Sequence, residues 1–208
     1  MAISNYSELK SSIGDWLNRS DLTSVIPTFI SLAEAQMERV LRTRQMIVRA
    51  TATIDSKYGA VPGDFLEVKS FKLTSTTPPQ PLQFVTVDEM DALDSLNTAT
   101  GRPRYFGVVG EQFRVHPSPD SNYTGELIYY AQLSKLSDSN TTNWLLTSSP
   151  DVYLYGALIQ AAPYLQDDAR INVWSGLYAA GVEAVQVSDD RAATSGGTLK
   201  VRAKPFGA

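Results

Sequence analysis

The sequence predicts an α+β protein, in which a mainly helical bundle built from both ends of the chain carries a small inserted antiparallel β unit and an extended C-terminal tail. Two observations predict this class. Hydrophobic residues repeat at helical spacing near both ends of the chain, and they alternate with a period of about two between residues 47 and 135. Because the helices come before and after the strands, segregated α+β packing is favoured over a parallel sheet.

The predicted organisation has three parts. The N- and C-terminal helices form one domain, the strands form a second domain inserted into it, and the end of the chain forms a flexible basic tail. The boundaries are residues 1–46 and 136–190 for the helical bundle, 47–135 for the β domain and 191–208 for the tail.

Composition describes an ordinary globular protein, with 43% hydrophobic residues and a formal net charge of -4. The acidic balance gives no general attraction to nucleic acid, so any contact with DNA must be local. The absence of cysteine excludes disulfides, thiolate metal sites and cysteine nucleophiles. Neither a signal peptide nor a run of about 18 apolar residues is present, so we expect no membrane partner.

Two helices are predicted before the strands. The first covers residues 5–18, where Asn5 and Glu8 form a variant of the capping box. The second begins with a proline that suits the first turn, and Arg39 and Arg42 lie near its negative end. These arginines fit either contacts with phosphate groups or pairing with acidic residues of the same or a neighbouring chain. The second interpretation is favoured.

Strands are predicted from residue 47 onward, in segments separated by Gly, Pro, Asn and Asp. In chain order these segments are "IVRATATI", "DFLEVKSFKLTST", "PLQFVTV", "RYFGVVGEQFRVHP" and "YTGELIYYAQL". One short helix interrupts them, because Thr86 and Glu89 form a capping box for "VDEMDALDSL".

After the strands the period returns to 3.6, which predicts a hairpin of two helices. The first begins at Ser149 and Pro150 and runs to about residue 165, with a kink or an end at Pro163. Its apolar and aromatic side chains point in nearly every direction, so two surfaces must cover it. The second spans about 168–187, and one face carries Ile171, Trp174, Leu177, Tyr178, Val182 and Val185.

The last eighteen residues, "RAATSGGTLKVRAKPFGA", form a basic segment without an acidic residue. The serine and two glycines predict a flexible joint, after which apolar and basic residues alternate as in a strand. We predict that this segment is either disordered or adds as a strand to a sheet edge of a partner. Its candidate binding residues are Leu199, Lys200, Val201, Arg202, Lys204 and Phe206.

The sequence contains no motif for catalysis or cofactor binding. His116 has neither a second imidazole for a metal site nor an evident nucleophile to serve, so we predict a structural role. Asp88, Asp91 and Asp94, at intervals of three, are typical of a solvated helix face rather than a calcium loop. We therefore predict no enzyme activity, no cofactor and no metal.

Several segments, in order, resemble one known family. They include "VPGDFLEV", "GRPRYFGVVGEQFRVHPSP", the Trp174 helix, "YSELKSSIGDWLNRSDLTSVIPTFISLAEAQMERVLRTRQM" and "LIYYAQLSKLSDSNTTNWLLTSSPDVYLYGALIQAAPYLQDD". Over nearly the whole chain they resemble the adaptor, or head-to-tail connector, proteins of short-tailed bacteriophages and related prophages. This family has no active-site motif to carry over.

The resemblance implies a structural virion protein that forms a dodecameric ring below the portal and extends the DNA channel towards the tail. Its implied partners are other copies of itself, the portal protein, tail or nozzle proteins, and double-stranded DNA that passes without sequence-specific binding. It implies assembly in the host cytoplasm and a place at the head–tail junction. The alternative is a monomeric carbohydrate-binding or hydrolysing tail domain, because two carboxylates suffice for glycoside hydrolysis.

A ring also accounts for the helix that is apolar on most sides. One side packs on its own bundle and another on the adjacent subunit. The other interpretation is a helix buried wholly within one subunit. The candidate subunit-interface residues are Tyr153, Tyr155, Leu158, Tyr164, Arg39 and Arg42.

Overall fold

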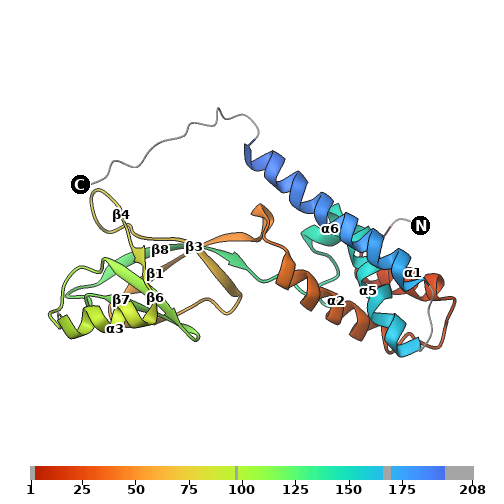
Figure 1. Ribbon diagram of the computed structural model, residues 1–208, viewed down its shortest axis with the longest axis horizontal. Helices are drawn as coiled ribbons and strands as arrows, with labels where there is room; N and C mark the ends of the chain where they lie inside the picture. Colours follow the sequence, from red (N-terminus) through yellow and green to blue (C-terminus); the bar gives the residue numbers. More distant parts are fainter. Residues whose placement is uncertain (1–2, 97, 166–169, 195–208) are drawn as a thin grey trace. The chain divides into compact units, whose positions relative to one another are not determined.

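The chain divides into two compact units by its internal contacts (Figure 1). The helical unit contains residues 1–45 and the chain from residue 133 onward, whereas the β unit contains residues 46–132. The two ends of the chain therefore build one unit, and the other is inserted between them. The computed structural model describes residues 3–96, 98–165 and 170–194.

The helical unit begins as the capping signals predict. The Asn5 side chain accepts a hydrogen bond of 3.0 Å from the Glu8 N–H, and the Glu8 carboxylate accepts hydrogen bonds from Ser4. The fifth helix begins at Pro150, as predicted, and continues through Pro163 into its last turn. The helices of this unit are α1 (Tyr6–Leu17), α2 (Ile26–Val40), α4 (Trp144–Ser148), α5 (Pro150–Leu165) and α6 (Ile171–Thr194).

The β unit follows a short 3-10 turn, η1 (Arg44–Met46), and contains two four-stranded sheets. The first has the order β1 (Ile47–Ile54), β8 (Tyr123–Ala131), β3 (Phe65–Leu73) and β4 (Gln80–Pro81). The second has the order β2 (Tyr58–Ala60), β7 (Gln112–His116), β6 (Tyr105–Val109) and β5 (Gln83–Phe84). Strands β5 and β6 pair in parallel, and the other pairs in the described residues are antiparallel.

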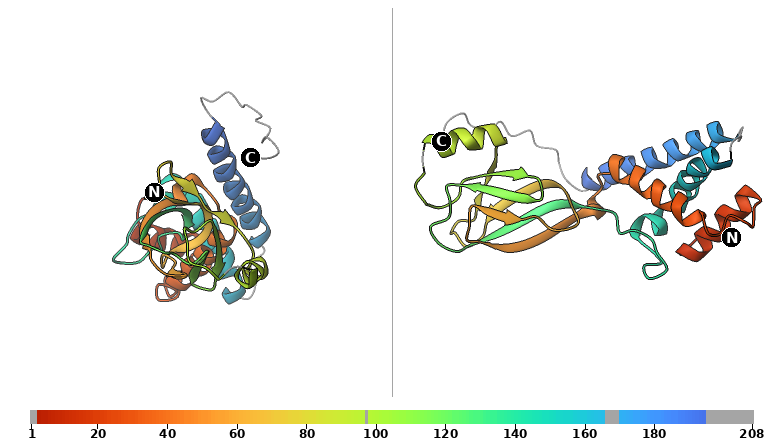
Figure 2. Two further views of the ribbon diagram at one scale, coloured as in Figure 1. Left: turned by 90° about the vertical axis from the view of Figure 1, so that its left-hand side faces the viewer. Right: turned by 90° about the horizontal axis from the view of Figure 1, so that it is seen from below.

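Aromatic side chains from both sheets form the core of the β unit. The ring of Phe71 on β3 lies edge-on to Phe106 on β6, with centroids 5.2 Å apart, and 5.3 Å from the ring of Phe113 on β7. The two sheets therefore pack face to face. Helix α3 (Val87–Leu96) packs against β6 and β7 through Met90, which is fully buried (Figure 2).

The prediction of a mainly helical bundle with a small β insertion is wrong. Of the described residues, 45% are helix and 23% are strand, and these strands form two sheets of four strands each, although the α+β class itself agrees. Period-two alternation located β1, β3, β6, β7 and β8, but it missed the three-residue strand β2. Alternation in a strand shows that one face is buried without showing which sheet covers it, so a second sheet was not foreseen.

Candidate functional site

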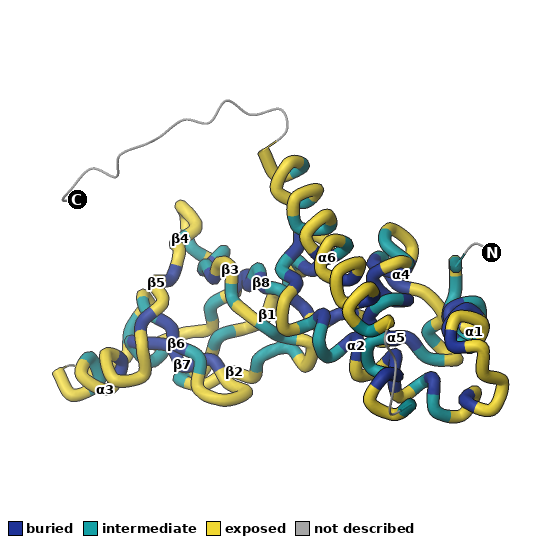
Figure 3. The backbone as a smooth tube through the Cα atoms, turned by 45° about the vertical axis from the view of Figure 1, so that its right-hand side comes forward, coloured by how far each residue is buried: buried dark blue, intermediate teal, exposed yellow. Residues whose placement is uncertain are grey.

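Helix α5 is the central element of the helical unit and packs against α1, α2, α4 and α6 (Figure 3). A Cβ atom at Gly156 would lie 3.1 Å from Met37 Cε on α2 and 3.1 Å from Tyr178 Cε2 on α6, so the glycine lets both helices approach closely. Tyr153 and Leu158 have no exposed surface. These two candidate interface residues lie inside the helical unit.

A buried carboxyl group supports this arrangement. Glu34 on α2 is only 2% exposed, and its Oε1 accepts hydrogen bonds from the Leu136 N–H at 2.8 Å and the Tyr153 hydroxyl at 3.1 Å. Asn143 donates to the Tyr153 oxygen at 2.6 Å. Burial raises the pKa of Glu34, and these hydrogen bonds offset that effect only in part. Burial also raises the pKa of Tyr153. The cluster fixes the chain around Leu136 to α2 and α5.

The sequence carries a signal for this position. Glu34 falls within the buried stripe of α2, beside Ile30, Ala33 and Met37, where a charged residue is rare unless it has partners.

Two other candidate interface residues reach the surface of the helical unit. Tyr164 is 56% exposed, and its ring lies edge-on to Phe29, with centroids 5.7 Å apart. Tyr155 is half-buried and lies edge-on to the exposed Trp16, also at 5.7 Å. Aromatic rings that are partly buried and partly exposed to water are enriched in protein–protein interfaces, so both residues remain candidates for the subunit interface.

Arg39 and Arg42 lie at the C-terminal end of α2. The Arg42 guanidinium donates to the backbone carbonyls of Glu38 at 2.8 Å and Leu41 at 2.7 Å, as expected for a cation at the negative end of a helix. Arg39 is exposed, and within the described residues its side chain forms no ion pair. Arg39 is therefore available to bind a partner, whereas Arg42 already binds carbonyl groups at the end of its own helix.

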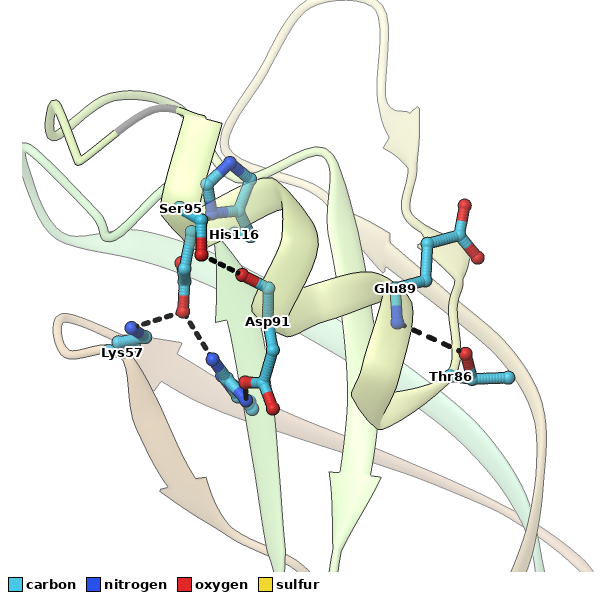
Figure 4. A network of polar contacts seen from close by, with 8 residues as sticks. Lys57, Thr86, Glu89, Asp91, Ser95 and His116 are labelled. Atoms are coloured by element: carbon cyan, nitrogen blue, oxygen red, sulfur yellow. Dashed lines mark hydrogen bonds and ion pairs between the residues drawn. The ribbon is translucent and has the colours of Figure 1, made fainter.

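An ionic cluster in the β unit anchors α3 to the strands (Figure 4). The Asp94 carboxylate accepts contacts from Lys57, Arg114 and His116, whose Nδ1 lies 2.8 Å away, and Arg114 also pairs with Asp91. Burial opposes ionisation of Asp94, but these donors outweigh it and hold the pKa of Asp94 well below its usual range. Asp94 therefore does not belong to a solvated face, and His116 has the structural role predicted for it.

The remaining predictions from the sequence concern chemistry and the tail. In the ranges that the structure describes, no group of three or more His, Asp or Glu side chains is arranged to hold a metal ion. None of the described helices is long and apolar enough to span a bilayer. The candidate tail residues lie outside the described residues: Leu199, Lys200, Val201, Arg202, Lys204 and Phe206.

Comparison with known families identifies the class of protein. A family model described as the SU10 adaptor protein matches residues 4–202, a range that covers both units. The match defines a phage head-to-tail adaptor, and it confirms the resemblance found in the sequence. This chain belongs to the SU10 adaptor protein family. A search of curated proteins found no match to it.

Proposed function

We propose that the chain is a subunit of a dodecameric ring that joins the portal of a phage head to the tail and extends the DNA channel. The observation that carries this proposal is the family match, which covers residues 4–202 rather than a single motif. In this role the chain is a virion protein at the head–tail junction. Its partners are other copies of itself, the portal protein and tail or nozzle proteins.

Features of the surface support a role in assembly. Tyr164 and Trp16 place aromatic surface on the outside of the helical unit, where a partner subunit can cover it. The net charge of -4 suits a channel lumen along which DNA slides without being held, because acidic side chains repel the phosphate backbone. DNA is thus a passing partner and not a ligand.

The basic C-terminal segment has a part in the same proposal. Residues 196–208 supply an alternation of apolar and basic side chains after two glycines. We assign them to contacts with the portal or a neighbouring adaptor subunit, in which the backbone adds a strand and the basic residues meet an acidic surface.

The test is assembly with portal rings of the same phage. The purified chain should bind the portal in a fixed ratio, with as many adaptor subunits as portal subunits, measured by native mass spectrometry and light scattering. Symmetric density below the portal in electron micrographs should show the ring. A chain that stays monomeric in the presence of portal rings, and leaves the portal mass unchanged, would contradict the proposal.

A further inference from the structure

Helix α6 carries an apolar stripe on the side that faces away from α5. Trp174, Tyr178 and Val182 occupy the inner face and are buried. Leu177, which the sequence places on the same face as Trp174 and Tyr178, is 42% exposed, and Val173 is 61% exposed. The exposed apolar residues alternate at intervals of four and three, which is the spacing of a coiled-coil seam. We call them the α6 seam: Val173, Leu177, Ala180, Ala184 and Val187.

Helix α2 presents a second outer stripe with the same alternation. Its inner face is buried through Phe29, Ile30 and Met37, whereas Leu32 on the opposite side is 48% exposed. The stripe is uncharged over most of its length and basic at its C-terminal end. We call it the α2 stripe: Thr28, Leu32, Ala35 and Arg39.

The charges beside the two surfaces are complementary. Glu183 directly precedes Ala184 of the α6 seam, which is the flanking position where coiled-coil charges select a partner, and Asp190 precedes Arg191, one step beyond the end of the seam. Neither carboxylate forms an ion pair within the described part of the chain, and the same holds for Arg39. Both acids lie in the C-terminal half of α6, and Arg39 lies in the last turn of α2. A second copy of this chain therefore fits better than an acidic partner or a purely apolar one.

The directions of α2 and α6 also suit a contact with a second copy of this chain. Both pack on α5 and run the same way, with their C-terminal ends at the same end of the helical unit (Figures 1 and 2). Two contacts join those ends: Gln186 donates to the Val40 carbonyl at 3.3 Å, and Arg44 pairs with Asp189 at 2.9 Å. A rotation about an axis roughly along these helices brings α6 of one copy beside α2 of the next, pointing the same way.

We propose that the α6 seam of one subunit packs in parallel along the α2 stripe of the next, with Leu177 near Leu32 and Glu183 near Arg39. This inference rests on the proposed ring and names the surfaces that form it. Because the two surfaces differ, the contact is head-to-tail and repeats around a ring, whereas a two-fold dimer would use one surface twice.

The absence of cysteine from the sequence permits a direct test. Oxidation of the double variant Leu32→Cys/Leu177→Cys should give a ladder of covalent oligomers longer than a dimer on a non-reducing gel, with portal rings present to drive assembly. A mixture of the two single variants should stop at dimers. The double variant Ser11→Cys/Ser175→Cys, at exposed positions outside both surfaces, is the matched control and should give no ladder.

Charge reversal tests the ion pair separately. Arg39→Glu or Glu183→Arg alone should weaken ring assembly by about tenfold, and the combined variant should recover most of the loss. Both positions are exposed, so the melting temperature of each free variant should stay unchanged. The contact is wrong if rings form normally on the portal but the double cysteine variant gives no ladder. It is also wrong if the combined charge variant does not recover assembly. Either result leaves the proposed function intact. Failure of the unmodified chain to form rings would overturn both.

Discussion

Glu34 on α2 binds both Tyr153 on α5 and the backbone at Leu136, but burial of its carboxyl group costs stability. Its carboxyl group is the shared acceptor for a backbone N–H and a tyrosine hydroxyl, both within the core of the helical unit. A neutral acceptor makes the same bonds without the desolvation that an ionised carboxylate suffers. The pKa of Glu34 is raised, so protonation of this group is more favourable in the folded chain than in the unfolded chain.

The first prediction follows from the sign of that pKa change. Stability from protonated Glu34 is complete below the unfolded pKa, about 4.3, and is lost as the pH rises through the higher folded pKa. Glu34→Gln keeps an acceptor oxygen and has no proton to lose. Its stability relative to the unmodified chain, measured by urea unfolding, should therefore increase as the pH rises above the unfolded pKa.

Glu34→Ala serves as the control for that experiment. It removes the acceptor and leaves the Leu136 N–H and the Tyr153 hydroxyl without it, so it should destabilise the chain at every pH. If the difference between Glu34→Gln and the unmodified chain stays flat with pH, ionisation of Glu34 does not affect stability.

The second prediction concerns Asp94, whose pKa changes in the opposite direction. Asp94→Asn leaves the nearly buried Arg114 with Asp91 as its remaining carboxylate, which should cost about 2–3 kcal/mol at pH 7. Because the folded pKa of Asp94 is lowered, this loss should shrink as the pH falls below about 4. Asp88→Asn, at an exposed position on the same helix, should change stability by no more than about 0.5 kcal/mol. Equal losses for both variants, by urea unfolding, would refute the anchoring role.

At the scale of elements, α5 depends on close approach by its neighbours. A Cβ atom at Gly156 would lie 3.1 Å from side chains of both α2 and α6, so bulk at this position must displace both. Gly156→Leu should lower the free energy of unfolding by about 3 kcal/mol or more. Gly176→Ala on α6, where an added Cβ meets nothing within 4 Å, should instead raise it by up to about 1 kcal/mol. Thermal and urea unfolding measure both, and a neutral Gly156→Leu would show that the helices shift freely.

Local signals predicted single elements well and their assembly poorly. The Thr86 capping box located the start of α3, because a cap is formed within four residues, and the Thr86 hydroxyl accepts from the Glu89 N–H at 3.3 Å. The interaction between Asp94 and His116 spans 22 residues and had no local signal. Helix α5 was recognised as unusual, yet its composition did not show whether its own subunit or another covers it.

At the scale of the whole molecule, one more prediction concerns the segment that follows α6. Deleting residues 196–208 should leave the melting temperature of the free chain unchanged and abolish stable association with portal rings, because many tails acting together strengthen weak single contacts. Sedimentation with portal rings over a range of salt concentrations measures this. A matched variant with Lys200, Arg202 and Lys204 changed to Gln should bind only at low salt. Undiminished binding by the truncated chain would show that the segment is dispensable.

The insertion of the β unit also determines the order in which the protein can be made. During synthesis α1 and α2 emerge first, but α5, which covers their apolar faces, follows the entire β unit. At roughly 5–20 residues per second, the ribosome exposes Phe29, Ile30 and Met37 for several seconds before α5 arrives. The β unit is complete by residue 132 and is free to fold during that wait. Folding therefore begins in the middle of the chain and ends where its two extremes meet. A nascent chain that ends before residue 150, and is held on the ribosome by a linker long enough to bring residue 132 out of the exit tunnel, should already protect the β unit from protease while α2 is still cleaved.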